Sequence, residues 1–500
     1  MATQTLTLLH ELLDHAAAEH GPRPAVGRGA EVETFRAVHT ASRRIAIGLV
    51  ERGVRRGDRV VLAVPPDVLV PALLYGCSRV GGVFCVLGEH APPVAYAHVL
   101  DDAEPTLVIT DNPDAARLAA ERGIGCLSLD ELRAIRPDHT EALPPGPIPV
   151  DPVCLIYTSG STGMPKAVVS THAQVTFAVT AIQSQLGYRA DDVIFCPLPL
   201  SFDYGMYQIF LATLAGARVQ LATAADAGPG LLAELHRTGA TVLPAVPGVA
   251  RGLARLLSRP AAQPPLLRLL TNTGSAMPDA VLHELRDRIP GLGVQLMFGL
   301  TECKRTTIMP VDEDLRRPGS GGRALPGTEV FAVDPDGRRL PPGEVGELVV
   351  RGPNVMAGYW RRPELTAQRF PRADGLFPQL RTGDFGWLDG EGYLYFVGRR
   401  DDIYKQRGFR VSATEVEVAA TRIAGVEAAA VLPPGGDRAE AMLIAVTRLA
   451  PHEVLALLHT QLEEFKVPRQ CRVVSTIPLT GNGKVDRAGL VRLATDGSHV

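Results

Sequence analysis

Hydrophobic and polar positions follow two patterns in the first half of the chain. Apolar residues at helical spacing predict amphipathic helices over residues 6–20 and 36–52, and a third helix is expected over residues 71–78. Short, unbroken apolar runs between and after these stretches predict buried strands. The runs occupy residues 60–64, 83–87, 106–110, 153–158, 167–170, 193–196, 217–221, 241–243 and 266–270. Strands that alternate with helices indicate α/β layers around a largely parallel sheet.

The pattern changes twice towards the C-terminus. From about residue 320 to 400, short apolar segments separated by Gly, Pro and Asp turns predict an antiparallel, β-rich subdomain. A compact α+β segment follows, with helices expected at residues 413–422 and 452–465 and strands at 427–432, 441–447 and 471–474. We therefore expect a large N-terminal domain over residues 1–399, built from layered α/β subdomains and the β-rich subdomain, and a small C-terminal domain over residues 400–500.

Composition narrows the classes of function. Apolar residues make up 46% of the 500 positions, which is enough for a large core, and the formal net charge of −3 argues against general nucleic-acid binding. The seven cysteines are scattered and never spaced as Cys-x-x-Cys, which favours reduced thiols over disulfides or a zinc site. The N-terminus lacks the basic start of a signal peptide, and no apolar run approaches the roughly 18 residues that span a bilayer. A cytoplasmic protein without membrane contact is expected.

One loop rich in glycine and hydroxyl side chains suits an anion. It lies between the predicted strands at 153–158 and 167–170 and contains Thr158, Ser159, Gly160, Ser161, Thr162, Gly163 and Lys166. Its backbone N–H groups can converge on a polyphosphate, with the hydroxyls and the lysine as further donors. It is not a Walker loop, because Gly-Lys-Ser/Thr is absent and a strand follows it instead of a helix. Taken alone, the segment is equally compatible with a simple turn between two strands.

Further motifs follow this loop in a fixed order. They occupy residues 298–303 (Phe-Gly-Leu-Thr-Glu-Cys), 381–384 (Arg-Thr-Gly-Asp), 398–401 (Gly-Arg-Arg-Asp), 407–410 (Arg-Gly-Phe-Arg) and 478–484 (Pro-Leu-Thr-Gly-Asn-Gly-Lys). Together with the loop they resemble the adenylate-forming superfamily, which includes acyl-CoA synthetases, adenylation domains of nonribosomal peptide synthetases and luciferases. The resemblance covers almost the whole chain. It implies that a carboxylate attacks the α-phosphorus of ATP, with Mg²⁺, and gives an acyl-AMP and pyrophosphate.

The resemblance assigns roles around ATP. The loop at 158–166 holds the β- and γ-phosphates. Phe298 stacks on adenine where many members have tyrosine, Thr301 contacts phosphate, Glu302 holds Mg²⁺, Asp384 accepts from the ribose hydroxyls, Arg399 contacts ribose and phosphate, and Lys484 reaches the carboxylate and α-phosphate. Cations and N–H donors suit a phosphorus centre that gathers negative charge. Outside this context, Glu302 and Asp384 would be read as surface ion-pair carboxylates and Lys484 as a solvated lysine.

The resemblance also implies a second half-reaction. Asp401 matches the family's hinge, about which the small, mobile C-terminal domain rotates. The rotation removes Lys484, brings residues 405–410 to the acyl-AMP and admits a phosphopantetheine thiol. His172, just after the loop, is expected to be structural.

The segment around Asp203 bears on the acid. In amino-acid-activating members an aspartate at this place pairs with the substrate's ammonium group, which is costly to bury unpaired. The alternative is that Asp203 caps the helix that follows. Local alignment with the family gives the pocket lining as Tyr204, Tyr207, Pro244, Thr271, Thr273, Met297, Arg305 and Thr306. Two tyrosines and a methionine favour a small amino acid such as alanine, serine or glycine. Arg305 either pairs with the carboxylate of an acidic substrate or points to solvent, and β-amino acids remain open.

The resulting prediction is an AMP-forming ligase that activates an amino acid for secondary metabolism, such as nonribosomal peptide, polyketide or antibiotic biosynthesis. The sequence shows no phosphopantetheine attachment motif, so we expect the acceptor to be a thiol or amine on a separate carrier protein. A CoA ligase for a non-amino carboxylic acid is the main alternative. A non-catalytic ATP-binding protein of the same fold is a remote one.

Overall fold

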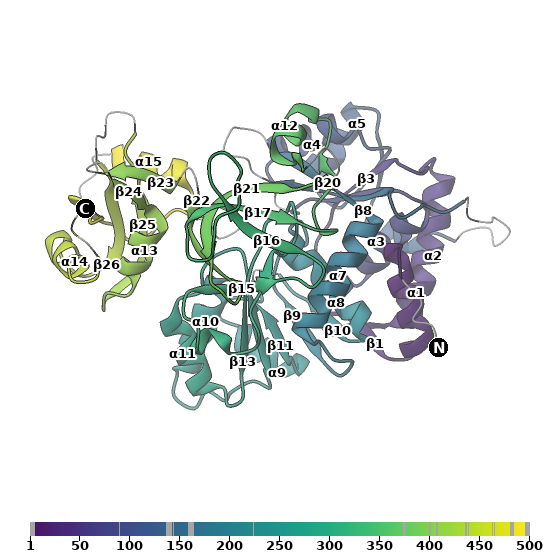
Figure 1. Ribbon diagram of the computed structural model, residues 1–500. Coiled ribbons are helices and arrows are strands. Elements are labelled where there is room, and N and C mark those ends of the chain that lie inside the picture. Colours follow the sequence, from purple (N-terminus) through teal and green to yellow (C-terminus); the bar gives the residue numbers. More distant parts are fainter. Residues whose placement is uncertain are drawn as a thin grey trace.

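The computed structural model in Figure 1 describes most of the chain. The described residues are 6–89, 91–136, 143, 145–158, 165–223, 225–373, 377–399, 402–406, 409–435, 438, 440–462, 464, 466–480 and 485–495. Within these residues the elements form two large sheets, a separate C-terminal sheet and the helices that cover them. None of the described helices is long and apolar enough to cross a membrane.

The first large sheet carries the glycine-rich loop at one of its turns. Among the described residues it has seven strands. In spatial order they are β18 (Gly358–Tyr359), β8 (Lys166–Thr171), β7 (Pro152–Thr158), β4 (Val83–Val86), β3 (Arg59–Ala63), β5 (Leu107–Thr110) and β6 (Gly125–Leu127). The pairs from β7 to β6 are parallel, whereas β18, β8 and β7 pair antiparallel. The hairpin β7–β8 brings Thr158 opposite Lys166, so both ends of the loop are fixed.

The second large sheet has thirteen strands among the described residues. In spatial order they are β16 (Glu329–Val333), β17 (Gly346–Arg351), β21 (Leu380–Leu388), β22 (Tyr393–Arg399), β15 (Ser320–Ala324), β14 (Thr307–Ile308), β13 (Gly293–Phe298), β12 (Leu269–Asn272), β11 (Val242–Pro244), β9 (Val193–Cys196), β10 (Arg218–Leu221), β1 (Pro24–Arg28) and β2 (Glu31–Thr34). The strands from β1 to β13 pair in parallel, and β13 begins the antiparallel part. The β-rich section thus continues the same sheet, and the change in sequence texture at about residue 320 marks a change in pairing direction.

Six of the described helices share one core with both large sheets (Figure 1); the shortest is α6 (Leu129–Ala134), and the other five are longer. They are α1 (Leu9–His20), α2 (Phe35–Glu51), α3 (Leu69–Arg79), α7 (His172–Leu186) and α8 (Asp203–Ala215). Every residue of α3 is buried, and so is α8 from Tyr204 to Thr213. A helix that is apolar on all sides must be surrounded by protein. The N-terminus of α8, where Asp203 lies, is therefore held by packing.

Other helices cover the outer faces of the two sheets. Alternate residues of the strands β3 and β4 face α4 (Pro93–Ala103) and α5 (Pro113–Glu121) instead of the shared core. Helices α9 (Leu231–Thr238), α10 (Pro247–Leu257) and α11 (Asp279–Arg288) form a second cluster on the thirteen-stranded sheet. The short helix α12 (Pro363–Arg369) and a 3-10 turn at Glu313–Leu315 complete the large part of the chain.

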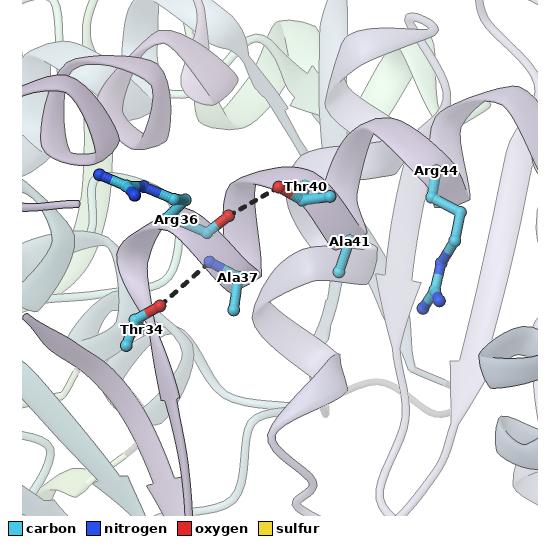
Figure 2. Close-up of a pocket in the computed structure, with 6 residues that line it drawn as sticks. All are labelled: Thr34, Arg36, Ala37, Thr40, Ala41 and Arg44. Carbon is cyan, nitrogen blue, oxygen red and sulfur yellow. Dashed lines mark hydrogen bonds between the residues drawn. The ribbon is translucent and has the colours of Figure 1, made fainter. Parts of the chain in front are cut away.

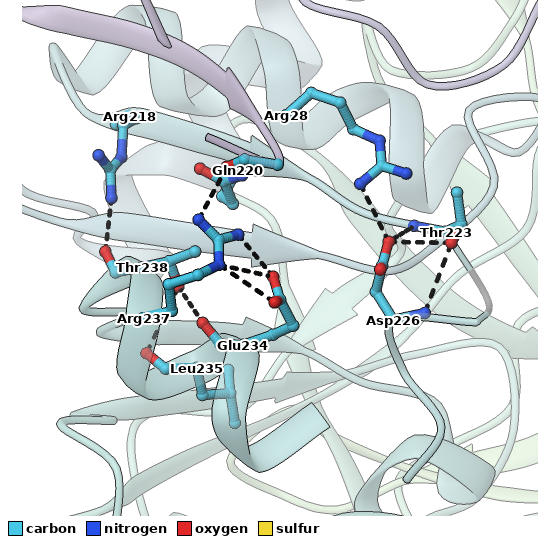
Figure 3. Close-up of polar contacts among 10 residues, drawn as sticks. Arg28, Arg218, Gln220, Thr223, Asp226, Glu234, Leu235, Arg237 and Thr238 are labelled. Carbon is cyan, nitrogen blue, oxygen red and sulfur yellow. Dashed lines mark hydrogen bonds and ion pairs between the residues drawn. The ribbon is translucent and has the colours of Figure 1, made fainter. Parts of the chain in front are cut away.

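Polar contacts fix the N-terminal hairpin β1–β2 to the parallel part of the second sheet (Figure 3). Arg28 pairs with Asp226 at 3.1 Å, and the Arg237 guanidinium donates to the carbonyl oxygen of Gly29 at 2.8 Å. On the next helix, α2, the hydroxyl of Thr34 accepts from the backbone N–H of Ala37 at 3.2 Å and caps the first turn. Figure 2 shows the open surface hollow beside this helix, whose lining includes none of the predicted site residues.

The C-terminal part has its own apolar core and lies to one side in Figure 1. Its described elements are the hairpin β23 (Ile403–Gln406) and β24 (Phe409–Ser412), the sheet β25 (Val426–Leu432), β26 (Met442–Thr447) and β27 (Gln470–Val473), and the helices α13 (Ala413–Thr421), α14 (Pro451–Leu458) and α15 (Arg487–Thr495). The α+β expectation for this segment is confirmed. A short hairpin, β19 (Arg372–Ala373) with β20 (Phe377–Pro378), lies in the large part.

Most predicted elements differ from the structure by one to three residues at an end, and two of the differences have a local reason. The helix expected at 452–465 ends at Leu458, and the two residues that follow, His459 and Thr460, have lower helix propensity than the leucines before them. The strand expected at 266–270 begins only at Leu269, because its partner β11 starts at Val242, which pairs with Leu269. Leu266 instead lies on the surface and is 73% exposed.

Candidate active site

Several residues predicted to line the acid pocket lie at the carboxyl ends of three neighbouring parallel strands. Pro244 ends β11 and pairs with Thr271 of β12, and Thr271 in turn pairs with Gln295 of β13. Met297 lies at the end of β13, and Thr273 directly follows β12. Loops and side chains at this edge of a parallel sheet commonly form ligand sites. The structure therefore brings together lining residues that are far apart in the sequence.

Two further residues predicted to line the acid pocket, Tyr204 and Tyr207, lie on α8. The Tyr204 hydroxyl hydrogen-bonds to the carbonyl oxygen of Thr271 at 2.8 Å and lies 2.9 Å from its side-chain oxygen, which ties α8 to β12. The Tyr207 hydroxyl is buried and has no hydrogen-bond partner among the described residues. Burial raises the pKa of both phenols, so both remain protonated donors. An unsatisfied buried hydroxyl is costly, and a bound ligand would relieve that cost at Tyr207.

Asp203 pairs with Arg305, another residue predicted to line the acid pocket. Arg305 Nη1 lies 3.1 Å from Asp203 Oδ2, and the two side chains are only 4% and 14% exposed, respectively. The Arg305 guanidinium also lies 4.8 Å from the centre of the Tyr204 ring. Two alternatives are therefore wrong: Arg305 does not point to solvent, and Asp203 makes no side-chain capping bond at the start of α8.

Lys304 is a second buried cation that the sequence reasoning missed. It has no exposed surface, and its Nζ donates to the carbonyl oxygen of Thr301 at 3.2 Å and lies 5.6 Å from the centre of the Tyr207 ring. Among the described residues, no carboxylate lies within ion-pair distance of this lysine. The signal that could have revealed it is the pair of consecutive cations that follows Glu302 and Cys303.

A tight loop presents these two cations. Lys304 has a positive φ of 61°, and the backbone N–H of Thr306 donates back to the carbonyl oxygen of Phe298 at 2.8 Å. Gly299 permits the close approach, since a Cβ there would lie 2.3 Å from the carbonyl oxygen of Lys304. The buried Asn354 side chain donates to the carbonyl oxygens of Cys303 and Arg305 at 3.2 and 3.1 Å. Asn354, also missed from the sequence, holds the loop in place.

Glu302 and Lys166 both contact the side chain of Tyr359. The Tyr359 hydroxyl donates to Glu302 Oε1 at 2.7 Å, and Lys166 Nζ lies 4.1 Å from the centre of the same ring. No group of three or more His, Cys, Asp or Glu side chains that could hold a metal occurs among the described residues. A single carboxylate fits Mg²⁺ bound mainly by phosphates and water. The residues present are therefore compatible with a magnesium–nucleotide complex.

Asp384 and Phe298 lie on the antiparallel part of the second sheet. Asp384 is 2% exposed and pairs through the backbone with Arg399 of the neighbouring strand. The Phe298 ring packs against that of Phe396, with centroids 5.4 Å apart and planes tilted by 33°. Phe396 is partly exposed, so the pair presents an apolar surface beside Asp384's strand. This arrangement suits an adenosine with its base on the ring and its ribose near the carboxylate.

Several predicted residues are outside the described part of the chain. They are Ser159, Gly160, Ser161, Thr162, Gly163, Asp401 and Lys484, together with the side chain of Arg399. Their roles remain predictions. His172, by contrast, is fully buried, and its Nδ1 accepts from the backbone N–H of Leu9 at 3.1 Å, which gives it a packing role.

The chain is similar to known proteins over nearly its full length. Residues 13–360 match the family described as AMP-binding enzyme, and residues 415–484 match the AMP-binding enzyme C-terminal domain. The feruloyl-CoA synthase of Amycolatopsis sp is 32% identical over 471 residues, which cover 92% of this chain and 94% of that protein. The dimodular nonribosomal peptide synthase of Bacillus subtilis (strain 168) is 29% identical over 479 residues, or 91% of this chain and 20% of that longer protein.

A solved structure gives the most specific similarity. The complex of VinN with L-aspartate is 38% identical in sequence, with a TM-score of 0.71, and the match covers 78% of this chain and 98% of that chain. The similarity therefore extends to a protein whose structure holds an amino acid with a second carboxylate.

Proposed function

Because the chain belongs to the AMP-binding enzyme family and is an AMP-forming ligase, we propose that it activates an amino acid that carries a second carboxylate. ATP, taken with Mg²⁺, is the cofactor of the family. The product of the first step is the aminoacyl adenylate, with pyrophosphate as the leaving group. The observation that carries this proposal is the buried Asp203–Arg305 pair beside the buried Lys304.

The charges of the pocket favour a dicarboxylic amino acid over a neutral one. Asp203 and Arg305 balance each other, so Lys304 leaves one positive charge without a carboxylate partner among the described residues. Uncompensated buried charge is strongly unfavourable. A substrate ammonium would be held by Asp203, and a second carboxylate would be shared by Arg305 and Lys304. A small neutral amino acid, which the sequence favoured, would leave the Lys304 charge unmatched.

The nucleotide roles that the family resemblance implies are part of the same proposal. Glu302 would hold Mg²⁺, which supplies positive charge at the phosphates, while Thr158 and Lys166 frame the loop for the leaving pyrophosphate. Phe298 would stack on adenine, and Asp384 would accept hydrogen bonds from the ribose hydroxyls. Lys484 would then approach the reacting carboxylate from the C-terminal part. The preorganised cations stabilise charge that develops at the α-phosphorus.

The second half of the proposal concerns the acceptor of the activated acid. We propose a phosphopantetheine thiol, or an aminoacyl amine, on a separate carrier protein, with Asp401 as the hinge of a rotating C-terminal domain. A CoA ligase for a non-amino acid is the second candidate, because Arg305 already neutralises Asp203 and the pocket then has no need of an ammonium. A CoA synthase among the relatives agrees with that candidate.

A pyrophosphate-release screen separates these candidates. The panel contains aspartate, glutamate and β-amino dicarboxylic acids, then alanine, serine, glycine and β-alanine, and finally aryl and fatty acids. We expect the dicarboxylic amino acids to give the highest kcat/KM, and Asp203→Ala to abolish release with every amino acid. Release with aryl or fatty acids and with no amino acid would refute the amino-acid proposal. Release with neutral amino acids alone would refute its dicarboxylic part.

A further inference from the structure

Tyr359 connects two groups that the proposed function places at the phosphates. Its hydroxyl donates to Glu302 Oε1 at 2.7 Å, while Lys166 Nζ lies 4.1 Å from the ring centre. The residue is 4% exposed and belongs to neither the glycine-rich loop nor the Glu302 motif. It follows Lys166 by almost two hundred positions, so only the fold brings the three side chains together.

The backbone of Tyr359 is fixed on both sides. Strand β18 pairs antiparallel with β8, which places Tyr359 opposite Val168. The backbone N–H of Trp360 donates to the carbonyl oxygen of Ala167 at 2.9 Å, and the N–H of Tyr359 donates to the Thr366 hydroxyl oxygen at 3.0 Å. The ring therefore has little freedom to move away from Lys166, the first residue of β8.

The same segment also holds Glu302. The backbone N–H of Met356 donates to the carbonyl oxygen of Glu302 at 2.9 Å. Phe370 packs edge-on against the Tyr359 ring, with centroids 5.5 Å apart. Residues 356–359 thus contact Glu302 through both backbone and side chain. These residues therefore set the distance between β8, which begins at Lys166, and the carboxylate of Glu302, which the proposed function assigns to Mg²⁺.

We propose that Tyr359 is a positioning residue for the magnesium–nucleotide complex, an inference that rests on the proposed function. Its hydroxyl occupies Oε1 of Glu302, and Oε2 would be the oxygen left to hold Mg²⁺. Its ring supports the charged end of Lys166 by a cation–π contact. A single tyrosine thereby couples the magnesium carboxylate to the lysine of the phosphate loop.

Two variants separate the hydroxyl from the ring. Tyr359→Phe keeps the ring and removes the hydrogen bond to Glu302, whereas Tyr359→Leu removes both contacts. Phe370→Leu is the matched control, because Phe370 packs on the same ring and its side chain has no polar group that could contact Glu302 or Lys166. Melting temperatures of all three variants show whether the fold is retained.

Calorimetric binding of ATP, with Mg²⁺ or with EDTA, is the primary measurement and needs no acid substrate. A hydrogen bond to a charged group is worth enough to change affinity about tenfold or more. We expect Tyr359→Phe to weaken ATP binding about tenfold in Mg²⁺ and to leave binding in EDTA unchanged. Tyr359→Leu should weaken binding in both conditions, and Phe370→Leu in neither.

A second measurement tests the coupling to Glu302. In a Glu302→Gln background, Tyr359→Phe should cause no further loss of Mg²⁺-dependent affinity, because the carboxylate it orients is gone. Equal losses with and without Mg²⁺ in Tyr359→Phe would overturn the proposal, as would an unchanged affinity in both conditions. The proposal would also be overturned if the wild-type protein bound ATP with the same affinity in Mg²⁺ and in EDTA. Failure of the proposed substrate class would appear elsewhere, as normal Mg²⁺–ATP binding without pyrophosphate release from any amino acid.

Discussion

At the scale of single residues, charge placement inside the pocket is the most informative feature. Asp203, Lys304 and Arg305 are all largely withdrawn from water, and only one pair of opposite charges is formed among them. Because these side chains are buried, a charge left without an opposite partner costs far more free energy than it would at the surface. The pocket should therefore discriminate between acids by the number and position of their charges.

Arg305→Met and Lys304→Met test this discrimination. Loss of a buried charge partner costs about 3 kcal/mol, so kcat/KM for a dicarboxylic amino acid should fall about 100-fold in Arg305→Met. Lys304→Met should lower the same constant and raise the relative use of neutral amino acids. Arg316→Met, at an exposed side chain, is the control. An unchanged ratio of dicarboxylic to neutral rates in Lys304→Met would contradict the assigned role of this lysine.

At the scale of elements, helix α8 carries Asp203 into the pocket only if its first turn packs closely. Gly205 lies in that turn, and a Cβ there would approach the carbonyl oxygens of Pro199 and Leu198 at 2.4 and 2.8 Å. Both atoms belong to the backbone, so a side chain could be accommodated only if the helix start moved. The position of Asp203 therefore depends on a residue without a side chain.

Gly205→Ala should lower stability by about 1–3 kcal/mol and raise KM for the acid, because overpacking displaces the start of α8. Gly252→Ala is the matched control: Gly252 also lies in a helix, α10, and a Cβ there would meet nothing within 4 Å. That substitution should stabilise the protein by up to about 1 kcal/mol through helix propensity. Urea denaturation and steady-state kinetics report both effects, and equal behaviour of the two variants would disprove the packing argument.

The junction of helices α1 and α7 gives a dependence of stability on pH. Burial lowers the pKa of His172 to about 3 and that of His10 to about 4, from a usual value of 6.5. The unfolded chain therefore binds more protons than the folded chain between about pH 4 and 6.5. This contribution to stability is complete above pH 6.5 and is lost as the pH falls, by about 1.4 kcal/mol per unit for His172.

The melting temperature should consequently fall as the pH is lowered from 7 to 5. In His172→Asn the slope should be shallower, since one of the two buried histidines is absent, while the side-chain oxygen can still accept from Leu9. A slope identical to that of the wild type would show that His172 does not titrate on unfolding in this range.

At the scale of the whole molecule, the large part supplies the pocket and the small C-terminal part supplies Lys484. Each part has its own apolar core, which is compatible with movement of one relative to the other. If a rotation about Asp401 exchanges the two half-reactions, residues of the small part should affect the two steps unequally. This is the expectation that the family resemblance raises.

Lys484→Ala should reduce adenylate formation by at least about 100-fold and leave thiol transfer from supplied aminoacyl-AMP largely intact. The reason is that, in the proposed mechanism, Lys484 contacts the reacting carboxylate only in the first step. Single-turnover assays of the two steps, with chemically prepared adenylate for the second, provide the measurement. Equal losses in both steps would argue against the rotation.

The sequence alone indicated the α/β alternation, the change to a β-rich section and the approximate position of many strands and several helices. Buried strands and amphipathic helices have local signatures, so α2 and β5 lie close to where periodicity placed them. The motif residues Thr158, Glu302 and Asp384 could be named as candidate site residues, because the motifs that contain them are contiguous in the chain. A predicted bound was wrong where a neighbouring strand determines it: β12 starts at the residue that pairs with the first residue of β11.

Only the tertiary structure decided what surrounds each functional side chain. The pairing of Arg305 with Asp203 and the contact of Tyr359 with Glu302 join segments that lie far apart in the chain. The burial of Lys304 depends on how its loop packs against the rest of the protein. Local propensity contains no information on such contacts, because burial and electrostatic pairing arise only after the sheets and helices pack. The sequence therefore indicated the class of reaction through its motifs, and only the packed structure shows the buried charges on which the proposed choice of acid rests.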